Sequence, residues 1–193
     1  METNKESEIL KGKKAILVDL DGTIVDTEKL DDAAMQAILK KNGILFAKKF
    51  IGCTLKEYVK DATKDKKLQA KIMTEFVKEY EYTLKNTKLR INYKLLSLLK
   101  KGCNLKVALV TSNNKRLTRL ILAKLGIKSF FDVIITCEDV KNNKPHPEPY
   151  LKALKKLNIN PANCVAFEDT KEGLQSAKSA GLDYQRIIIG GRK

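Results

Sequence analysis

The chain has 193 residues, of which 43% are hydrophobic and 32% charged, with a formal net charge of +15. This length and composition predict a folded domain with room for a small insertion, and they exclude low-complexity and collagen-like chains. No apolar run approaches a membrane span and residues 1–8 lack the apolar core of a secretory signal, so we expect a cytoplasmic protein with no membrane partner.

The first predicted element is a strand over Ala15–Val18, preceded by a charged segment, residues 1–13, that we expect to be a flexible tail. Its unbroken apolar run is typical of a strand buried on both faces of a parallel sheet. Two carboxylates, Asp19 and Asp21, stand where this run ends, and Gly22 lets the chain turn sharply there. Ligands bind beyond the carboxyl ends of the strands in open α/β sheets, so these carboxylates are candidates for chemistry.

The region from residue 26 to residue 86 shows helical patterns only. Apolar residues at helical spacing predict a helix over residues 26–42, followed by a short connector. A capping-box pattern at residues 54–57 opens a short helix, and an amphipathic stripe predicts a longer helix over residues 66–85. Because we expect no strand here, we interpret residues 26–86 as a small helical module inserted after the first strand.

From residue 87 onward, predicted strands and helices alternate. The strands are expected over residues 105–110, 131–136, 164–167 and 187–189. Three of the expected helices end at Gly102, Gly126 and Gly181, and another spans residues 150–157. This alternation predicts a doubly wound, Rossmann-like sheet of about five parallel strands with helices on both faces. Residues 14–25 and 87–193 would form this α/β core.

Polar clusters follow the later strands or their loops. They are Thr111, Ser112 and Asn113 after the second strand, Lys144 in a proline-containing loop, and Glu168 and Asp169 after the fourth strand. Each has a purely structural interpretation, because the first and last could cap helices and Lys144 could lie on the surface. Taken together with the carboxylates after the first strand, they would gather in one crevice and are chemically complementary.

The segment from Asp19 to Asp26 could be only a polar turn. A calcium loop would need a further ligand before Gly22 and a closing glutamate, and the sequence has neither. The buried strand followed by Asp-x-Asp-Gly-Thr-Ile-Val-Asp resembles the nucleophile motif of the haloacid dehalogenase-like phosphatases. The clusters match that superfamily in order and content over residues 15–189, and residues 165–181 resemble its helical-cap branch, which includes phosphoglycolate phosphatase and β-phosphoglucomutase.

The resemblance implies a role for each cluster. Asp19 would be the nucleophile that forms an aspartyl phosphate, and Asp21 would protonate the leaving alcohol and later help to activate water. Thr111 and Lys144 would contact the transferring phosphoryl group. Substrate-binding roles fall to Ser112 and Asn113, and the implied Mg²⁺ ligands are Asp19, the Asp21 backbone carbonyl, Asp169 and Glu168, the last directly or through water. The four scattered cysteines and single histidine do not form a zinc pattern.

The resemblance also implies that residues 26–86 form a helical cap that closes over the crevice and excludes water. Its loop residues Gly52, Thr54 and Lys56 resemble the family's substrate-specificity loop. Lys56 would meet an anionic substrate group, although it could equally be a plain surface lysine. The implied activity is Mg²⁺-dependent hydrolysis of a small phosphomonoester through an aspartyl-phosphate intermediate. We expect a monomer whose partner is a small phosphorylated metabolite.

Two other functions remain open. Phosphomutases of the β-phosphoglucomutase type resemble this chain but carry a histidine in the first cap hinge. Asp31 stands at about that place here, which favours hydrolysis. A basic nucleic-acid-binding protein with a silent phosphatase site would explain the net charge, most of which lies in residues 40–106. The basic surface lacks the arginine content and the aromatic interleaving typical of nucleic-acid surfaces, so we expect no specific nucleic acid and interpret the lysines as a solvated face without a polyanion partner. Steering of small anionic substrates is an intermediate alternative.

Overall fold

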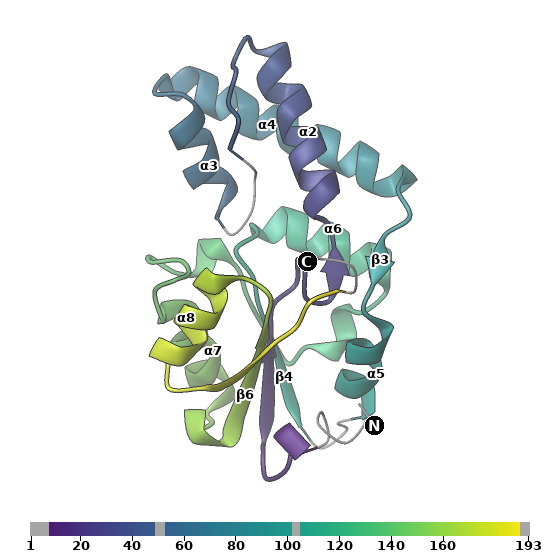
Figure 1. Ribbon diagram of the computed structural model, residues 1–193, viewed down its shortest axis with the longest axis vertical. Coiled ribbons are helices and arrows are strands. Elements are labelled where there is room, and N and C mark those ends of the chain that lie inside the picture. Colours follow the sequence, from purple (N-terminus) through teal and green to yellow (C-terminus); the bar gives the residue numbers. More distant parts are fainter. Residues whose placement is uncertain (1–7, 49–52, 102–104, 190–193) are drawn as a thin grey trace.

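A computed structural model describes residues 8–48, 53–101 and 105–189. One sheet contains five parallel strands in the order β5-β4-β1-β6-β7 (Figure 1). The strands are β1 (Ala15–Val18), β4 (Lys106–Val110), β5 (Val133–Ile135), β6 (Cys164–Glu168) and β7 (Asp183–Arg186). The first strand lies at the centre, where Val18 stands opposite Leu109 on one side and Phe167 on the other. The predicted doubly wound parallel sheet is confirmed.

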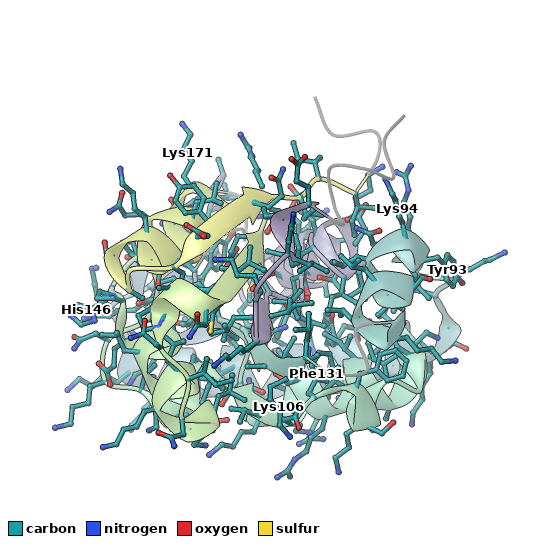
Figure 2. The ribbon with its side chains drawn as sticks, turned by 90° about the horizontal axis from the view of Figure 1, so that it is seen from below. Tyr93, Lys94, Lys106, Phe131, His146 and Lys171 are labelled. Atoms are coloured by element: carbon teal, nitrogen blue, oxygen red, sulfur yellow. The ribbon has the colours of Figure 1, made fainter. Side chains whose placement is uncertain are left out.

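Helices cover both faces of the sheet because successive side chains of a strand point to opposite faces. Ile16 and Val18 belong to a core that includes apolar side chains of α5 (Tyr93–Lys101) and α6 (Lys115–Leu125). Ala15 and Leu17 belong to a second core, shared with α7 (Glu148–Leu157) and α8 (Lys171–Ser179). Seen from below, the two layers flank the sheet, and long side chains such as that of Lys171 extend outward (Figure 2).

Three helices form a lobe above the carboxyl ends of the strands (Figure 1). They are α2 (Glu28–Lys41), α3 (Leu55–Ala62) and α4 (Lys66–Asn86), and both α2 and α3 pack on α4. The predicted capping box opens α3, where the Thr54 side chain accepts a hydrogen bond from the Glu57 backbone amide. The predicted stripe of α4 is buried at Ile72, Phe76, Tyr80 and Leu84. No helix in the described ranges is long and apolar enough to cross a membrane.

A short antiparallel ribbon joins the lobe to the sheet, and the sequence did not predict it. Strand β2 (Val25–Asp26) pairs with β3 (Arg90–Ile91) where the chain enters and leaves the helical lobe. The expectation of no strand in residues 26–86 is therefore wrong at Asp26. Two paired residues are too few to produce a period-2 pattern, so hydrophobic periodicity could not reveal this ribbon.

The last strand also differs from the prediction. Strand β7 covers Asp183–Arg186, whereas residues 187–189 come after it. All four β7 residues are exposed, since this is an edge strand and polar residues are common there. Within the apolar run that suggested a strand, Ile189 is buried and Ile187 packs against the core, whereas Ile188 is exposed.

The predicted tail falls partly outside the described residues, which begin at Glu8. In the described part, Ile9 and Leu10 pack against the hydrophobic core. Farther along, Lys14 donates a backbone hydrogen bond to Asn163 at 2.7 Å, immediately before β1. The chain is thus in contact with the core several residues before its first strand.

Candidate active site

The end of β1 places Asp19 beside a buried lysine. The backbone amide of Asp19 continues the sheet pattern by donating to the Phe167 carbonyl at 3.0 Å. Lys144 comes from the loop between β5 and α7, and its Nζ donates to Asp19 Oδ1 at 2.7 Å and to the Val110 carbonyl at 2.9 Å. Because Asp19, Lys144 and Val110 come from three separate segments, this contact ties the carboxyl ends of β1 and β4 to the loop.

Lys144 also bridges to a second carboxylate. Its Nζ lies 2.5 Å from Glu168 Oε1, and the hydroxyl of the fully buried Tyr150 donates to the same oxygen at 2.5 Å. Burial lowers the pKa of Lys144, but the carboxylates of Asp19 and Glu168 outweigh it and hold that pKa above its usual value. Lys144 therefore stays positively charged throughout the physiological pH range.

Three carboxylates lie together at this edge of the sheet. Asp19, Glu168 and Asp169 each offer an oxygen atom, and these oxygens lie within 4.8 Å of one another. Glu168 Oε2 is buried without a hydrogen-bond partner among the described atoms, and Thr23 donates to Asp169 Oδ1 at 3.4 Å. Burial raises the pKa of Glu168, an effect that Lys144 opposes and Asp19 increases. Crowded oxygen ligands with one unsatisfied buried atom fit a hard divalent cation such as Mg²⁺.

Asp21 lies in a different environment from Asp19. Its Oδ1 accepts a hydrogen bond from Thr27 at 2.6 Å, and its Oδ2 accepts one from the Asn113 side chain at 2.7 Å and one from Thr111 at 3.5 Å. Burial raises the pKa of Asp21 well above its usual value, and the nearby carboxylates of Asp31 and Asp19 raise it further. The structure thus favours a protonated Asp21 next to Asp19, which is the arrangement that acid catalysis requires.

A pocket of about 580 Å³ opens over these groups, between the sheet edge and the helical lobe. Although the whole chain carries a charge of +15, Lys144 is the one basic side chain among the described residues of this lining. The lining residues are Asp19, Asp21, Gly22, Thr27, Glu28, Asp31, Cys53, Thr111, Ser112, Asn113, Lys144, Asp169 and Thr170. The described part of the pocket lining is therefore acidic, in contrast to the lysine-rich composition of the chain.

The structure brings most of the sequence-predicted site residues together. The lining includes seven of them, namely Asp19, Asp21, Thr111, Ser112, Asn113, Lys144 and Asp169. Glu168 lies behind the lining, in contact with Lys144. The loop residues behave differently, because the Thr54 side chain caps α3 and Lys56 is exposed and does not line the pocket. Gly52 lies outside the described residues, and Cys53 is the loop residue that reaches the pocket.

Several residues of the site were not predicted. Thr27 and Glu28 stand at the start of α2, where their sequence signal is that of a helix terminus. Tyr150 has the spacing of an ordinary core residue of α7, and a buried hydroxyl leaves no trace in a hydrophobic pattern. A tyrosine rather than a phenylalanine at a fully buried position is the one available hint, because buried tyrosine hydroxyls usually find a partner.

Comparisons with known proteins agree with this geometry. Residues 16–187 match the family profile described as haloacid dehalogenase-like hydrolase. The chain is 30% identical over 191 residues to a phosphorylated carbohydrates phosphatase of Thermotoga maritima, covering 88% of this chain and 82% of that protein. It is 31% identical over 185 residues to a phosphoglycolate phosphatase of Aquifex aeolicus, covering 92% and 85%.

A solved structure shows the same fold. It is that of a β-phosphoglucomutase from Clostridium difficile, with a TM-score of 0.78 and 27% sequence identity, and the match covers 89% of this chain and 83% of that one.

Proposed function

The chain belongs to the haloacid dehalogenase-like hydrolase family, and from this premise we propose that it hydrolyses a small phosphomonoester through an aspartyl phosphate on Asp19, with Mg²⁺ as cofactor. The observation that carries the proposal is the arrangement of Asp19, Lys144 and Asp169 at the carboxyl edge of the sheet. Asp19 pairs with Lys144 at 2.7 Å and shares a carboxylate cluster with Asp169. The named phosphatases among its relatives support the same reaction class.

In this mechanism, Asp19 attacks the phosphorus atom. A carboxylate is ionised at neutral pH without a helping base, so it can form an acyl phosphate directly. Lys144 is held at the nucleophile and places a positive charge where the transferring phosphoryl group develops negative charge. Thr111 and Ser112 line the same pocket and would donate hydrogen bonds to phosphoryl oxygens.

Asp21 would protonate the oxygen of the leaving alcohol and then accept a proton from the attacking water. Its raised pKa supports the first role, because the acid form persists above the usual range of a carboxyl group. Thr27 and Asn113 hold its carboxyl group in place from two sides. A raised pKa and a fixed orientation would both favour proton transfer by Asp21.

Mg²⁺ would be held by Asp19, Asp169, the backbone carbonyl of Asp21 and, directly or through water, Glu168. When bound, the cation supplies charge neutralisation for the phosphoryl oxygens and orients the nucleophile. The buried Oε2 of Glu168, which lacks a hydrogen-bond partner in the described structure, supports its place in or beside this ligand set.

We also propose that residues 26–86 act as a cap. The helices α2, α3 and α4 stand above the carboxyl ends of the strands (Figure 1), and residues of this region form part of the pocket wall. The ribbon of β2 and β3 is where both connections to the sheet pass, so small backbone rotations there would open or close the pocket.

A phosphomutase is the second candidate, supported by the similarity to β-phosphoglucomutase. A mutase must protect its aspartyl phosphate from water until a sugar returns. Such mutases carry a histidine in the first cap hinge. Asp31 stands at about that place here, and its carboxyl group lines the pocket and raises the pKa of Asp21. We therefore propose hydrolysis as the outcome.

One experiment tests the proposal. Purified protein should hydrolyse p-nitrophenyl phosphate with added Mg²⁺, and excess EDTA should abolish this activity. Calcium should inhibit, because its larger and looser coordination shell would misplace the nucleophile. Asp19→Asn should lose at least about 10⁴-fold in kcat without a change in circular dichroism. Asp61→Asn is the control, because Asp61 is a half-exposed carboxylate in an ion pair with Lys48 and does not line the pocket. Full activity in EDTA, or of Asp19→Asn, would disprove the mechanism.

A further inference from the structure

A groove separate from the active-site pocket lies between the helical lobe and α6. Helix α6 packs against α4 of the lobe (Figure 1), and two contacts near the end of α4 bridge the helices. Arg116 forms an ion pair with Glu81 at 3.0 Å, and Lys124 donates a hydrogen bond to the Lys85 carbonyl at 3.2 Å. The groove runs beside an earlier part of α4, since the α4 residues of its lining fall within residues 70–78. No described residue lines both the groove and the active-site pocket.

An apolar strip forms part of this groove. Met73 and Val77 of α4, together with Leu120 of α6, pack against the hydrophobic core but remain partly exposed. Residues three or four positions apart lie on one face of a helix, so this face of α4 differs from its buried stripe at Ile72 and Phe76. The apolar side chains of the described lining are Leu55, Ala70, Met73, Val77, Leu120 and Ala123. The groove therefore offers apolar surface that the fold itself leaves partly uncovered.

Basic side chains lie in the same lining, namely Lys78, Lys115, Arg116 and Arg119. Lys115 forms an ion pair with Asp139 at 3.1 Å, whereas Lys78 and Arg119 are exposed beside the apolar strip. The lining also contains Glu138, whose carboxylate accepts a hydrogen bond from the Lys115 backbone amide at 2.6 Å. The chain has five arginines and 33 lysines, and two of the five arginines lie here. Arginine is enriched and lysine depleted in protein interfaces, so this placement differs from a general excess of lysine.

These features match an acidic amphipathic helix. Its apolar side chains, repeating every three or four residues, would lie on the apolar strip, and its carboxylates would meet the cations beside that strip. The strip on α4 is about 12 Å long, or roughly two helical turns, so a short helix covers it. A second copy of this chain is a poor occupant, because both copies carry a net charge of +15 and repel each other. Nucleic-acid bases stack best on aromatic rings, whereas the apolar side chains of the described lining are aliphatic or a thioether.

We propose that the groove between α4 and α6 binds an acidic amphipathic helix of a partner protein. One wall of the groove belongs to the helical lobe and the other to the sheet layer, so the partner would contact both. The proposal does not depend on the phosphatase reaction, because the groove and the active-site pocket share no described residue.

A labelled peptide tests the proposal. The probe is a fluorescein-labelled helix of about 18 residues, or five turns, with leucines along one face and glutamates on both sides of them. One control peptide has the same composition in scrambled order, and a second has lysine in place of glutamate. Fluorescence anisotropy at about 0.15 M salt, where long-range attraction is screened, measures the three affinities. We expect the probe to bind the wild-type protein at least about tenfold more tightly than either control peptide.

Matched variants locate the binding. Arg119→Glu reverses a charge in the groove, and Ala70→Glu places a carboxylate on its apolar strip. Both residues are exposed, so the fold should tolerate the changes, which circular dichroism checks. Lys155→Glu is the control for net charge, since Lys155 is exposed on α7, which covers the opposite face of the sheet from α6. Each groove variant should weaken binding of the probe by at least about tenfold, and Lys155→Glu by less than about twofold.

The outcomes decide the proposal. Equal binding of the probe and the scrambled peptide would overturn it, because the apolar strip would then play no part. An equal loss in Arg119→Glu and Lys155→Glu would also overturn it, since the attraction would come from net charge alone. Single-stranded DNA that binds the wild type more tightly than the probe, and loses that affinity in Arg119→Glu, would assign the groove to a nucleic acid instead. None of these results bears on hydrolysis of p-nitrophenyl phosphate, so the two proposals fail separately.

Discussion

The carboxyl group of Glu168 lies directly over Gly173, in the space that a β-carbon on Gly173 would occupy. Gly173 is in the first turn of α8, where its amide donates to the Thr170 side chain at 3.1 Å. This glycine is therefore needed for space and not for an unusual backbone angle. The space lets Glu168 reach both Lys144 and Tyr150.

Gly173→Ala should consequently lower the free energy of unfolding and reduce kcat. Replacing a helical glycine by alanine ordinarily stabilises a helix by roughly 0.5–1 kcal/mol. Here the methyl group would displace Glu168, and we expect a loss on the order of 1–3 kcal/mol from overpacking. Urea unfolding and kcat should both show the effect, with the exposed Gln175→Ala on the same helix as control. A more stable and fully active Gly173→Ala protein would contradict the close approach.

Asp21→Asn should separate proton donation from nucleophilic attack. Alkyl phosphates need a protonated leaving oxygen, so the variant should lose roughly 10²–10⁴-fold in kcat on them. With p-nitrophenyl phosphate, whose leaving group needs little protonation, it should show a burst followed by slow dephosphorylation. Stopped-flow measurement of p-nitrophenol release distinguishes the two phases. Equal burst and steady rates would remove Asp21 from activation of water.

The same residue predicts a pH dependence. The pKa of Asp21 is raised, chiefly by burial, so its acid form persists above the usual range and is lost as pH rises through the raised pKa. In the wild type, kcat for an alkyl phosphate should therefore fall with rising pH more steeply than kcat for p-nitrophenyl phosphate. This difference should disappear in Asp21→Asn. A steeper fall for the aryl ester would contradict the assignment.

Asp31 should make stability depend on pH. Burial raises its pKa from 3.8 to about 7 in the folded protein. A carboxyl group with a raised pKa stabilises the fold while it is protonated, and that contribution disappears as pH rises through 7. Asp31→Asn should therefore be more stable than the wild type at pH ~9, on the order of 2 kcal/mol, and nearly equal to it at pH ~5. Urea unfolding in EDTA measures both, and an equal difference at the two values would contradict the shift.

The lysine-rich outer surface should affect the rate at which the protein associates with small anionic substrates. If it steers small anions, kcat/KM should fall as salt is added while kcat hardly changes, because screening affects association and not the bound complex. Duplex DNA should bind weakly and without sequence preference at low salt. Kinetics over a range of ionic strength, together with a DNA titration, measure both effects. Tight binding of a specific DNA or RNA at physiological salt would instead favour the nucleic-acid-binding alternative.

The sequence alone determined the elements whose signal is local. The apolar run of β1, the apolar stripe of α4 and the capping box at Thr54 each involve residues that are close together in the sequence. Hydrophobic and capping patterns therefore predicted these elements directly. The placement of Asp19 and Asp21 after β1 was predictable for the same reason. A parallel sheet gathers all its carboxyl ends at one edge, so the motif spacing also predicted which clusters would meet.

Only the tertiary structure decided contacts between segments far apart in the chain. Lys144 and Asp19 are 125 positions apart in the sequence. No local pattern predicts that the ammonium group of Lys144 contacts Asp19, Glu168 and the Val110 carbonyl. The presence of Glu28 and Asp31 in the pocket lining likewise depends on where α2 stands over the sheet.

The edge strand β7 and the ribbon of β2 and β3 escaped prediction for a related reason. An exposed edge has no buried face to impose an alternating pattern, and a two-residue pairing has no period at all. A hydrophobic pattern indicates which side chains are buried. Strand pairing at a sheet edge and the charge of a pocket lining depend instead on residues that folding brings together from distant parts of the chain. The sequence therefore determined the reaction class we propose, and the packing of the lobe on the sheet decided which residues of α2 line the pocket.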